Sequence, residues 1–281
     1  MGHYWAAAMS VSTYDYDSER DRHTIASEIR ELFRYRDLLK ALVAKTIKSR
    51  YKRSALGVVW TLLNPLVNMM VLALAFSTVF RNAVPNYPVY ILIGLTAWNF
   101  FSQSTAWAMG QFAWGGALMK HVYVPPSIFA VACVSNGIIN VGFSLVPLVG
   151  IMLFLGHPFH ATWWFFPIAL LLLAGFCLGV ALFMSTLAVF FTDVVDMYQL
   201  LLQAWFFLTP IIYPRQVFPA RYGWLMSINP MYPLIELVRR PIYAGQLPEP
   251  QLVLAGSAWA LASLAVGAWA FTTKAHEFAY R

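Results

Sequence analysis

The fold of this chain is set by residues 34–80, RYRDLLKALVAKTIKSRYKRSALGVVWTLLNPLVNMMVLALAFSTVF. The first half of this stretch is basic and amphipathic, whereas the second half, residues 57–80, contains no charged side chain. The 24 residues of that second half are enough to cross the hydrocarbon core of a bilayer as one helix. We therefore expect a helix on the membrane surface that leads directly into a first membrane span.

The basic half predicts a cytosolic amphipathic interface helix over residues 24–53. At about 100° per residue, several Lys and Arg side chains fall on one side, and the opposite side carries Ile25, Ile29, Leu32, Leu39, Val43 and Ile47. Burial of the apolar side and attraction of the basic side to anionic headgroups hold such a helix at a membrane. Residues 1–23 are polar and aperiodic, and we expect them to form a disordered tail.

Composition places the whole chain in a membrane. Of its 281 residues, 60% are hydrophobic and only 11% are charged, far below the roughly 25% of a soluble domain. Asp, Glu, Lys and Arg are absent from four long blocks, 82–119, 121–192, 197–214 and 250–273. We predict an all-α polytopic membrane protein whose transmembrane domain, residues 54–281, has six spans at about 57–80, 88–112, 127–155, 162–191, 197–213 and 251–273.

Residues 214–249, between the fifth and sixth spans, have a different character. This segment contains six prolines, four arginines and many aromatic residues. Prolines at this spacing do not allow one continuous spanning helix. Irregular backbone also cannot face lipid, so we expect short re-entrant helices at the membrane interface.

The distribution of basic residues predicts the orientation. With both termini in the cytosol, inner segments hold 14 of the 19 Lys and Arg residues and outer segments hold five. Cytosolic loops carry the excess of Lys and Arg, so this orientation is the favoured one. The segment 214–249 is then external, and we expect a multi-pass protein of a bacterial inner or plasma membrane.

Three stretches of the chain resemble a known family. They are RYKRSALGVVWTLLNPL (50–66), KHVYVPPSIFAVA (120–132), and FLTPIIYP with INPMYPLIELVRRPIYAG within 207–245. Together with the order of spans, they resemble the membrane subunit of ABC-2 type exporters, specifically the permeases that export O-antigen, capsule or teichoic-acid polysaccharides. The first cytosolic loop of that family often reads Phe-Pro-Arg followed by an acid, whereas this chain has Val124-Pro125-Pro126-Ser127 and lacks both charges.

The resemblance implies a half-transporter that works with a separate ATPase. The chain contains no Gly-x-x-x-x-Gly-Lys-Ser/Thr phosphate loop. We therefore expect no cofactor in this chain, with ATP and Mg²⁺ bound by the partner subunit. The expected partners are a second copy of the chain, two ABC ATPase subunits, a lipid-linked polysaccharide and membrane lipids, but no nucleic acid.

The resemblance also implies a path for the polysaccharide. Polar or aromatic side chains within the spans are the candidates for its lining, namely Asn64, Asn68, Trp98, Phe101, Trp107, Phe112, Trp205 and Phe206. Aromatic rings can stack on the C–H faces of sugars. Roles in helix packing and in membrane anchoring are open alternatives for these residues, because span amides usually bond to a neighbouring helix and aromatic rings gather at membrane interfaces.

Contacts with the ATPase subunit are implied at three inner segments. The candidates are Arg50, Lys52 and Arg53 of the basic helix, Lys120, His121 and Tyr123 of the first inner loop, and Asp193 and Asp196 of the second. The basic helix alternatively serves only as a lipid anchor. Asp193 and Asp196 could form an acid–base pair, but no histidine lies near them in sequence, so an inner loop is the simpler interpretation.

Other functions compete with polysaccharide export. An ABC-2 exporter of drugs or small lipids is possible, as is a membrane-embedded glycosyl- or acyltransferase, which would need clustered Asp, Glu or His residues at one membrane face. Ion-coupled transport needs ionisable groups inside the spans. From residue 82 to 192 the only Asp, Glu, Lys or Arg is Lys120, in a loop. Polysaccharide export is the function that we expect.

Overall fold

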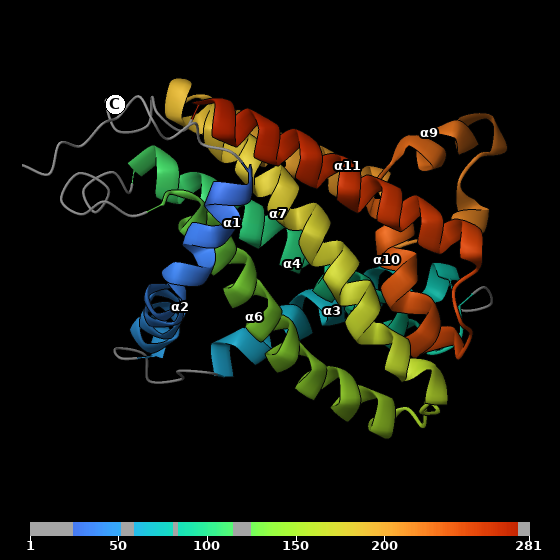
Figure 1. The fold of residues 1–281 in the computed structure, drawn as a ribbon. Helices are drawn as coiled ribbons and strands as arrows, with labels where there is room; N and C mark the ends of the chain where they lie inside the picture. The colour runs from blue at the N-terminus through green and yellow to red at the C-terminus, as the bar shows by residue number, and fades with distance from the viewer. Residues whose placement is uncertain (1–24, 52–58, 81–83, 115–124, 275–281) are drawn as a thin grey trace, which may run out of the picture.

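The computed structural model describes residues 25–51, 59–80, 84–114 and 125–274, and every regular element in these ranges is helical (Figure 1). The longer helices are α1 (Ile25–Arg34), α2 (Arg36–Tyr51), α3 (Val59–Phe80), α4 (Tyr87–Trp114), α6 (Ser127–Phe154), α7 (Phe166–Phe190), α8 (Val194–Leu208) and α11 (Pro250–Lys274). The shorter ones are η1 (Ala161–Phe165), η2 (Arg215–Val217), η3 (Ala220–Tyr222), α9 (Gly223–Ile228), α10 (Met231–Arg239) and η4 (Arg240–Ala244). The predicted tail, residues 1–23, lies outside the described ranges.

Five of the described α-helices pack around α4. Every residue from Val89 to Trp98 is buried, because α3, α6, α7, α8 and α10 all contact this helix. A helix that is covered on all sides does not need separate polar and apolar faces. The run of apolar residues in α4 therefore forms the centre of the core, with Ile91, Leu92 and Phe101 fully buried.

Three of the described helical segments are long and apolar enough to cross a membrane. They are α6, η1 joined to α7, and α11, and shorter apolar helices occur at Leu66–Val79, within α3, and in α8. Helix α4 is as long as α6, but Asn99, Ser102 and Gln103 make its middle more polar. These lengths and compositions are those of a polytopic membrane protein.

The fifth span differs from its predicted bounds of 197–213. Helix α8 begins earlier, at Val194, and ends at Leu208. Pro210 lacks an N–H donor and disfavours helical backbone at the residue before it. Thr209 is accordingly extended, and its hydroxyl donates to the carbonyl oxygen of Trp205 at 2.8 Å. With 15 residues, α8 is shorter than a full membrane span.

The amino-terminal helix also differs from the single element predicted over 24–53. Two helices, α1 and α2, meet at Tyr35. Their apolar side packs on protein, since Leu32, Tyr35 and Leu39 contact a cluster that includes Phe129 and Phe271. Part of the face that was expected to rest on lipid is therefore covered by the ends of α6 and α11.

A buried carboxylate fastens α1 to α6. The hydroxyl of Ser127 donates to Glu28, and both side chains are buried. Ser127 is the first residue of α6, where the helix dipole favours a negative charge. This contact joins the amino-terminal helix to the start of α6.

Short helices form the proline-rich segment 214–249, as predicted. Its longest element, α10, has nine residues and inserts into the core, with Leu234, Ile235 and Leu237 almost fully buried. It packs against α4, α7 and α11. The segment is therefore part of the packed domain rather than a peripheral loop.

Arg239, at the end of α10, is the most buried cation that the structure describes, with 2% of its side chain exposed. Its guanidinium donates to the hydroxyl of Tyr90 at 3.0 Å and to the carboxylate of Glu236 at 2.8 Å. It also donates to the carbonyl oxygens of Pro210 at 3.0 Å and Ile211 at 3.2 Å, just beyond the end of α8. One side chain thus joins α10, α4 and the end of α8.

Two residues of α4, Tyr90 and Gly94, lie directly against this guanidinium. The Tyr90 ring lies 3.9 Å from its central carbon, in a cation–π arrangement. A Cβ atom at Gly94 would collide with the Nη2 atom of Arg239. Glycine at position 94 is therefore required by the close approach of the guanidinium.

Helices α7 and α11 run side by side in close contact (Figure 1). Gly175 and Gly179 form a Gly-x-x-x-Gly pattern on α7, and they face Ala260, Ser263 and Gly267 of α11. A Cβ atom at Gly179 would overlap with the backbone of Ser263, and one at Gly267 would overlap with the carbonyl group of Gly179. Small residues at membrane helix contacts allow such backbone-to-backbone packing.

We predict that Gly179→Ala separates α7 from α11 and destabilises the protein by on the order of 1–3 kcal/mol, because no side chain can move aside for the added methyl group. Gly150→Ala is the matched control, since a Cβ atom there meets no atom within 4 Å. Thermal unfolding of both variants in detergent checks the prediction. Equal midpoints for the two variants would contradict it.

We predict that Arg239→Met destabilises the protein by about 3 kcal/mol, because the Pro210 and Ile211 carbonyls and the Glu236 carboxylate lose a buried donor. Arg221→Met is the control, because Arg221 is exposed and stacks only on Tyr222 at 4.6 Å. Limited proteolysis and thermal unfolding measure the loss. An Arg239→Met protein as stable as the control would show that the network is dispensable.

Candidate functional site

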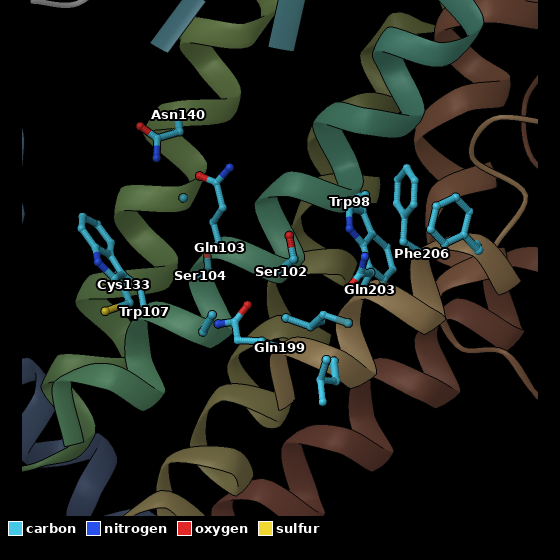
Figure 2. A pocket seen from close by; sticks show the side chains of 15 residues that line it. Trp98, Ser102, Gln103, Ser104, Trp107, Cys133, Asn140, Gln199, Gln203 and Phe206 are labelled. Carbon is cyan, nitrogen blue, oxygen red and sulfur yellow. The ribbon is translucent and has the colours of Figure 1, made fainter. Parts of the chain in front are cut away.

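An open pocket of about 900 Å³ lies between α4, α6 and α8 (Figure 2). We call it the α4–α6–α8 pocket. It is lined by Trp98, Ser102, Gln103, Ser104, Ala106 and Trp107 of α4, by Cys133, Gly137 and Asn140 of α6, and by Gln199, Leu200, Leu202, Gln203, Phe206 and Phe207 of α8. Its volume is in the range of sites that hold one small ligand or a few sugar units.

Helical spacing brings these side chains to one place. Residues three, four or seven apart lie on the same face of a helix. On α8 the lining residues Gln199, Gln203 and Phe206 follow this spacing, and on α4 Gln103 and Trp107 do so. In Figure 2, these side chains project from facing helices into a shared space.

The chemistry of the lining is polar but uncharged. Four amides line the pocket, those of Gln103, Asn140, Gln199 and Gln203, together with the hydroxyls of Ser102 and Ser104. An amide offers both hydrogen-bond donors and an acceptor, as a hydroxyl does. Gln103, Gln199 and Gln203 are exposed to the pocket opening. The lining can therefore bind a neutral ligand that is rich in hydroxyl groups.

Aromatic rings form the second part of the lining. Trp107 is 38% exposed and lines the pocket. Trp98 is buried, and the edges of its ring meet Phe206 at 5.6 Å and Trp205 at 6.2 Å between centroids. Phe101 lies behind these rings, 5.3 Å from Trp205. The aromatic side chains thus divide into rings that face the pocket and rings that support them.

Hydrogen bonds hold α8 at both of its ends. Near the start, the buried hydroxyl of Tyr198 donates to Thr105 of α4 at 2.7 Å. Near the end, the indole N–H of Trp205 donates to Asn229 at 2.8 Å, and the Asn229 amide donates to Thr209 at 3.0 Å. Between these contacts α8 presents its amides to the pocket. The position of the pocket wall therefore depends on bonds at the two ends of a short helix.

The predicted path residues do not all meet at this pocket. Trp98, Trp107 and Phe206 line it. Trp205 and Phe101 belong to the supporting rings, and Phe112 is buried in the separate cluster beside α1 and α2. Asn68 is exposed on α3, away from the pocket lining, and Asn64 lies in the same helix.

The predicted ATPase contacts are only partly within the described ranges. Asp193 and Asp196 are exposed at the start of α8. Arg50 lies in α2. Lys52, Arg53, Lys120, His121 and Tyr123 lie outside the residues that the structure describes.

The sequence prediction missed the amides of the pocket. The sequence did carry a signal for them, because it has Gln103, Gln199 and Gln203 within or beside apolar segments. An amide inside a membrane needs a hydrogen-bond partner. Asn140 carries the same signal in α6. The two amides that the sequence prediction did name, Asn64 and Asn68, belong to α3 and not to the lining.

Metal binding has no support among the described residues. No three His, Cys, Asp or Glu side chains gather there closely enough to hold an ion. The two cysteines, Cys133 and Cys177, are buried and form no disulfide. The site that the described part of the chain offers is the uncharged pocket.

Comparisons with known proteins identify the family. The family described as ABC-2 type transporter matches residues 37–243. The O-antigen export system permease protein RfbA of Myxococcus xanthus is 32% identical over 257 residues, which cover 89% of this chain and 97% of that protein. A protein of the same name from Klebsiella pneumoniae is 30% identical over 201 residues, 71% of this chain and 77% of the relative. The polysialic acid transport protein KpsM of Escherichia coli is 25% identical over 218 residues, 75% and 83% of the two chains. The chain therefore belongs to the ABC-2 type transporter family, as a multi-pass membrane permease.

Proposed function

We propose that this permease moves a lipid-linked polysaccharide of the O-antigen or capsule type across the inner or plasma membrane of a bacterium. The α4–α6–α8 pocket, lined by amides, hydroxyls and aromatic rings, is the observation that carries the proposal. The names of the relatives from Myxococcus xanthus and Klebsiella pneumoniae support the same substrate class. As an ABC permease, the chain is the membrane component, and ATP is bound by a separate ATPase partner.

The lining suits a polymer that has to move. Amide side chains can exchange one hydroxyl partner for the next as sugar units pass, because each amide both donates and accepts. The ring of Trp107 gives a flat surface for the C–H face of a sugar. No residue of the lining carries a fixed charge that would hold one unit tightly. Such a surface binds each unit weakly, which favours sliding.

An exporter of drugs or small lipids is the second candidate function. The pocket volume of about 900 Å³ also matches a drug-sized ligand. The amide groups of the lining distinguish the two candidate functions. A small apolar lipid offers these amides no hydrogen-bond partner, whereas the hydroxyl groups of a glycan do. Polysaccharide export is therefore the better supported function.

The proposed membrane arrangement has six spans, formed by α3, α4, α6, η1 with α7, α8 and α11. Both termini are cytosolic, because 14 of the 19 Lys and Arg residues then lie inside. Helices α1 and α2 lie at the inner membrane surface, and residues 214–249 form re-entrant helices at the outer surface. The exposed basic side of α2, with Lys45 and Lys48, contacts anionic lipid headgroups.

A second copy of the chain completes the transport path in this proposal. Val67, Met70, Val71 and Leu74 form one exposed apolar face on α3. Met197, Leu200, Leu201 and Leu208 form another on α8, beside the pocket residues. Pairing of these faces across a dimer axis would enclose the open side of the pocket. The homodimer works with two ATPase subunits.

The ATPase subunits contact the inner ends of the helices in this arrangement. Asp193 and Asp196 provide exposed carboxylates at the start of α8, which forms the pocket wall. Arg50, Lys52 and Arg53 continue from α2, and Lys120, His121 and Tyr123 belong to the loop before α6. Movement of an ATPase subunit against the start of α8 would therefore reach the pocket directly.

We predict that a cysteine in place of Asp193 reacts with a membrane-impermeant thiol reagent only from the cytosol, and that a cysteine in place of Arg221 reacts only from outside. Both positions are exposed, and the native thiols of Cys133 and Cys177 are buried. Labelling of intact cells and of inverted vesicles measures the two sides. The reverse pattern would rule out the proposed orientation.

We predict that Trp107→Ala and Phe206→Ala each lower glycan export by roughly threefold to tenfold, since an aromatic contact contributes about 0.5–1.5 kcal/mol. The measurements are polysaccharide at the cell surface and ATP hydrolysis by the purified permease–ATPase complex with and without lipid-linked glycan. Basal ATP hydrolysis is expected to persist.

Trp269→Ala is the matched control for these variants. Trp269 is 65% exposed on α11, away from the pocket, and its loss should leave export unchanged. Normal export by both pocket variants would show that the pocket is not part of the transport path. Stimulation of ATP hydrolysis by a drug or free lipid, but not by glycan, would favour the second candidate function.

A further inference from the structure

We infer that the polysaccharide handled by this permease has an electrically neutral repeat unit. This inference rests on the proposed function, and it specifies the substrate class of the same pocket. Its basis is the pattern of charged and neutral groups along α8 and across the pocket. The membership of the family leaves the charge of the substrate open, because one relative is named for transport of polysialic acid.

The polar groups of the pocket match neutral sugars better than acidic ones. Gln103, Asn140, Gln199 and Gln203 each present an acceptor oxygen beside a donor group. A sugar hydroxyl can use both, because it donates and accepts. A carboxylate only accepts, so it would leave the amide oxygens unpaired or facing its negative charge. The lining therefore discriminates by hydrogen-bond type.

The three segments that contain the pocket lining supply no compensating charge. Residues 82–119, 121–192 and 197–214, which contain the whole lining of the pocket, lack Lys and Arg as well as Asp and Glu. An anion that passes between apolar helices without a cationic partner loses hydration that nothing replaces. A polymer with a carboxylate on every repeat would meet this cost at each step.

The first charged group on the pocket side of α8 has the wrong sign for an anion. Asp196 precedes Gln199 by three residues and Gln203 by seven, so the three side chains share one face of the helix. Asp196 is exposed, as is Asp193 just before it. A negatively charged polymer that approaches along this face is repelled, whereas a neutral one is not.

The test compares two glycans that differ only in charge. Proteoliposomes contain the permease with its ATPase partner and receive either a lipid-linked neutral hexose polymer or the same polymer with its primary alcohols oxidised to carboxylates. ATP hydrolysis and the fraction of end-labelled glycan shielded from a membrane-impermeant quencher are measured. We expect transport of the neutral polymer to exceed that of the oxidised one by at least about tenfold.

Variants of Gln203 distinguish charge selection from a structural defect. Gln203→Lys should raise the ratio of oxidised to neutral transport by several-fold, and Gln203→Glu should not, because only the first supplies a cationic partner. A merely structural effect would lower the transport of both glycans equally and leave the ratio of their transport rates unchanged. Gln216→Lys is the control, since Gln216 is exposed in η2 and is not part of the lining.

The outcomes separate this inference from the proposed function. Transport of both polymers at rates within about twofold of each other would overturn the inference and leave polysaccharide export intact. An unchanged ratio in Gln203→Lys would also overturn it. If a complex with active ATPase moves neither polymer, the proposed function fails, and the inference fails with it.

Discussion

A backbone carbonyl that leaves a helix inside a membrane protein must find a donor within the protein, and this constraint acts where α8 ends. The break before Pro210 leaves the carbonyls of Pro210 and Ile211 outside the helix, and the guanidinium of Arg239 binds both. The position of α10 and the glycine at position 94 follow from this requirement. The carboxyl end of the pocket wall α8 is thereby fixed by Arg239, a residue of the proline-rich segment.

Much of the fold could be predicted because its signals are local. The charge-free blocks predicted the bounds of the long helices to within a few residues, and the prolines of 214–249 predicted short helices there. The bounds of α8 were missed because apolar residues continue to Ile212, and only the backbone of Pro210 ends the helix. Amphipathicity identified the amino-terminal helix, but it did not reveal that Leu32 and Leu39 pack on protein, since lipid and a protein core select the same side chains.

The pocket shows the same division between local and long-range signals. Trp98, Trp107 and Phe206 were among the predicted aromatic candidates and line the pocket, whereas Phe101 and Phe112 are equally aromatic and lie in the core. Which ring faces a cavity depends on how helices are rotated against each other, and composition does not encode that rotation. The amides of α4 and α8 complete the surface. Aromatic and amide groups together make a lining with polar contacts and no fixed charge.

The contact between Gly179 and Gly267 determines which parts of the molecule can slide. Backbone meets backbone there, with no flexible side chains between α7 and α11 to absorb a shear movement. These two helices therefore form one rigid unit, and α6 and α4 pack against it. Helix α8 is shorter, and hydrogen bonds near its two ends hold it in place. A movement of α11 in this domain is therefore expected to carry α7 with it.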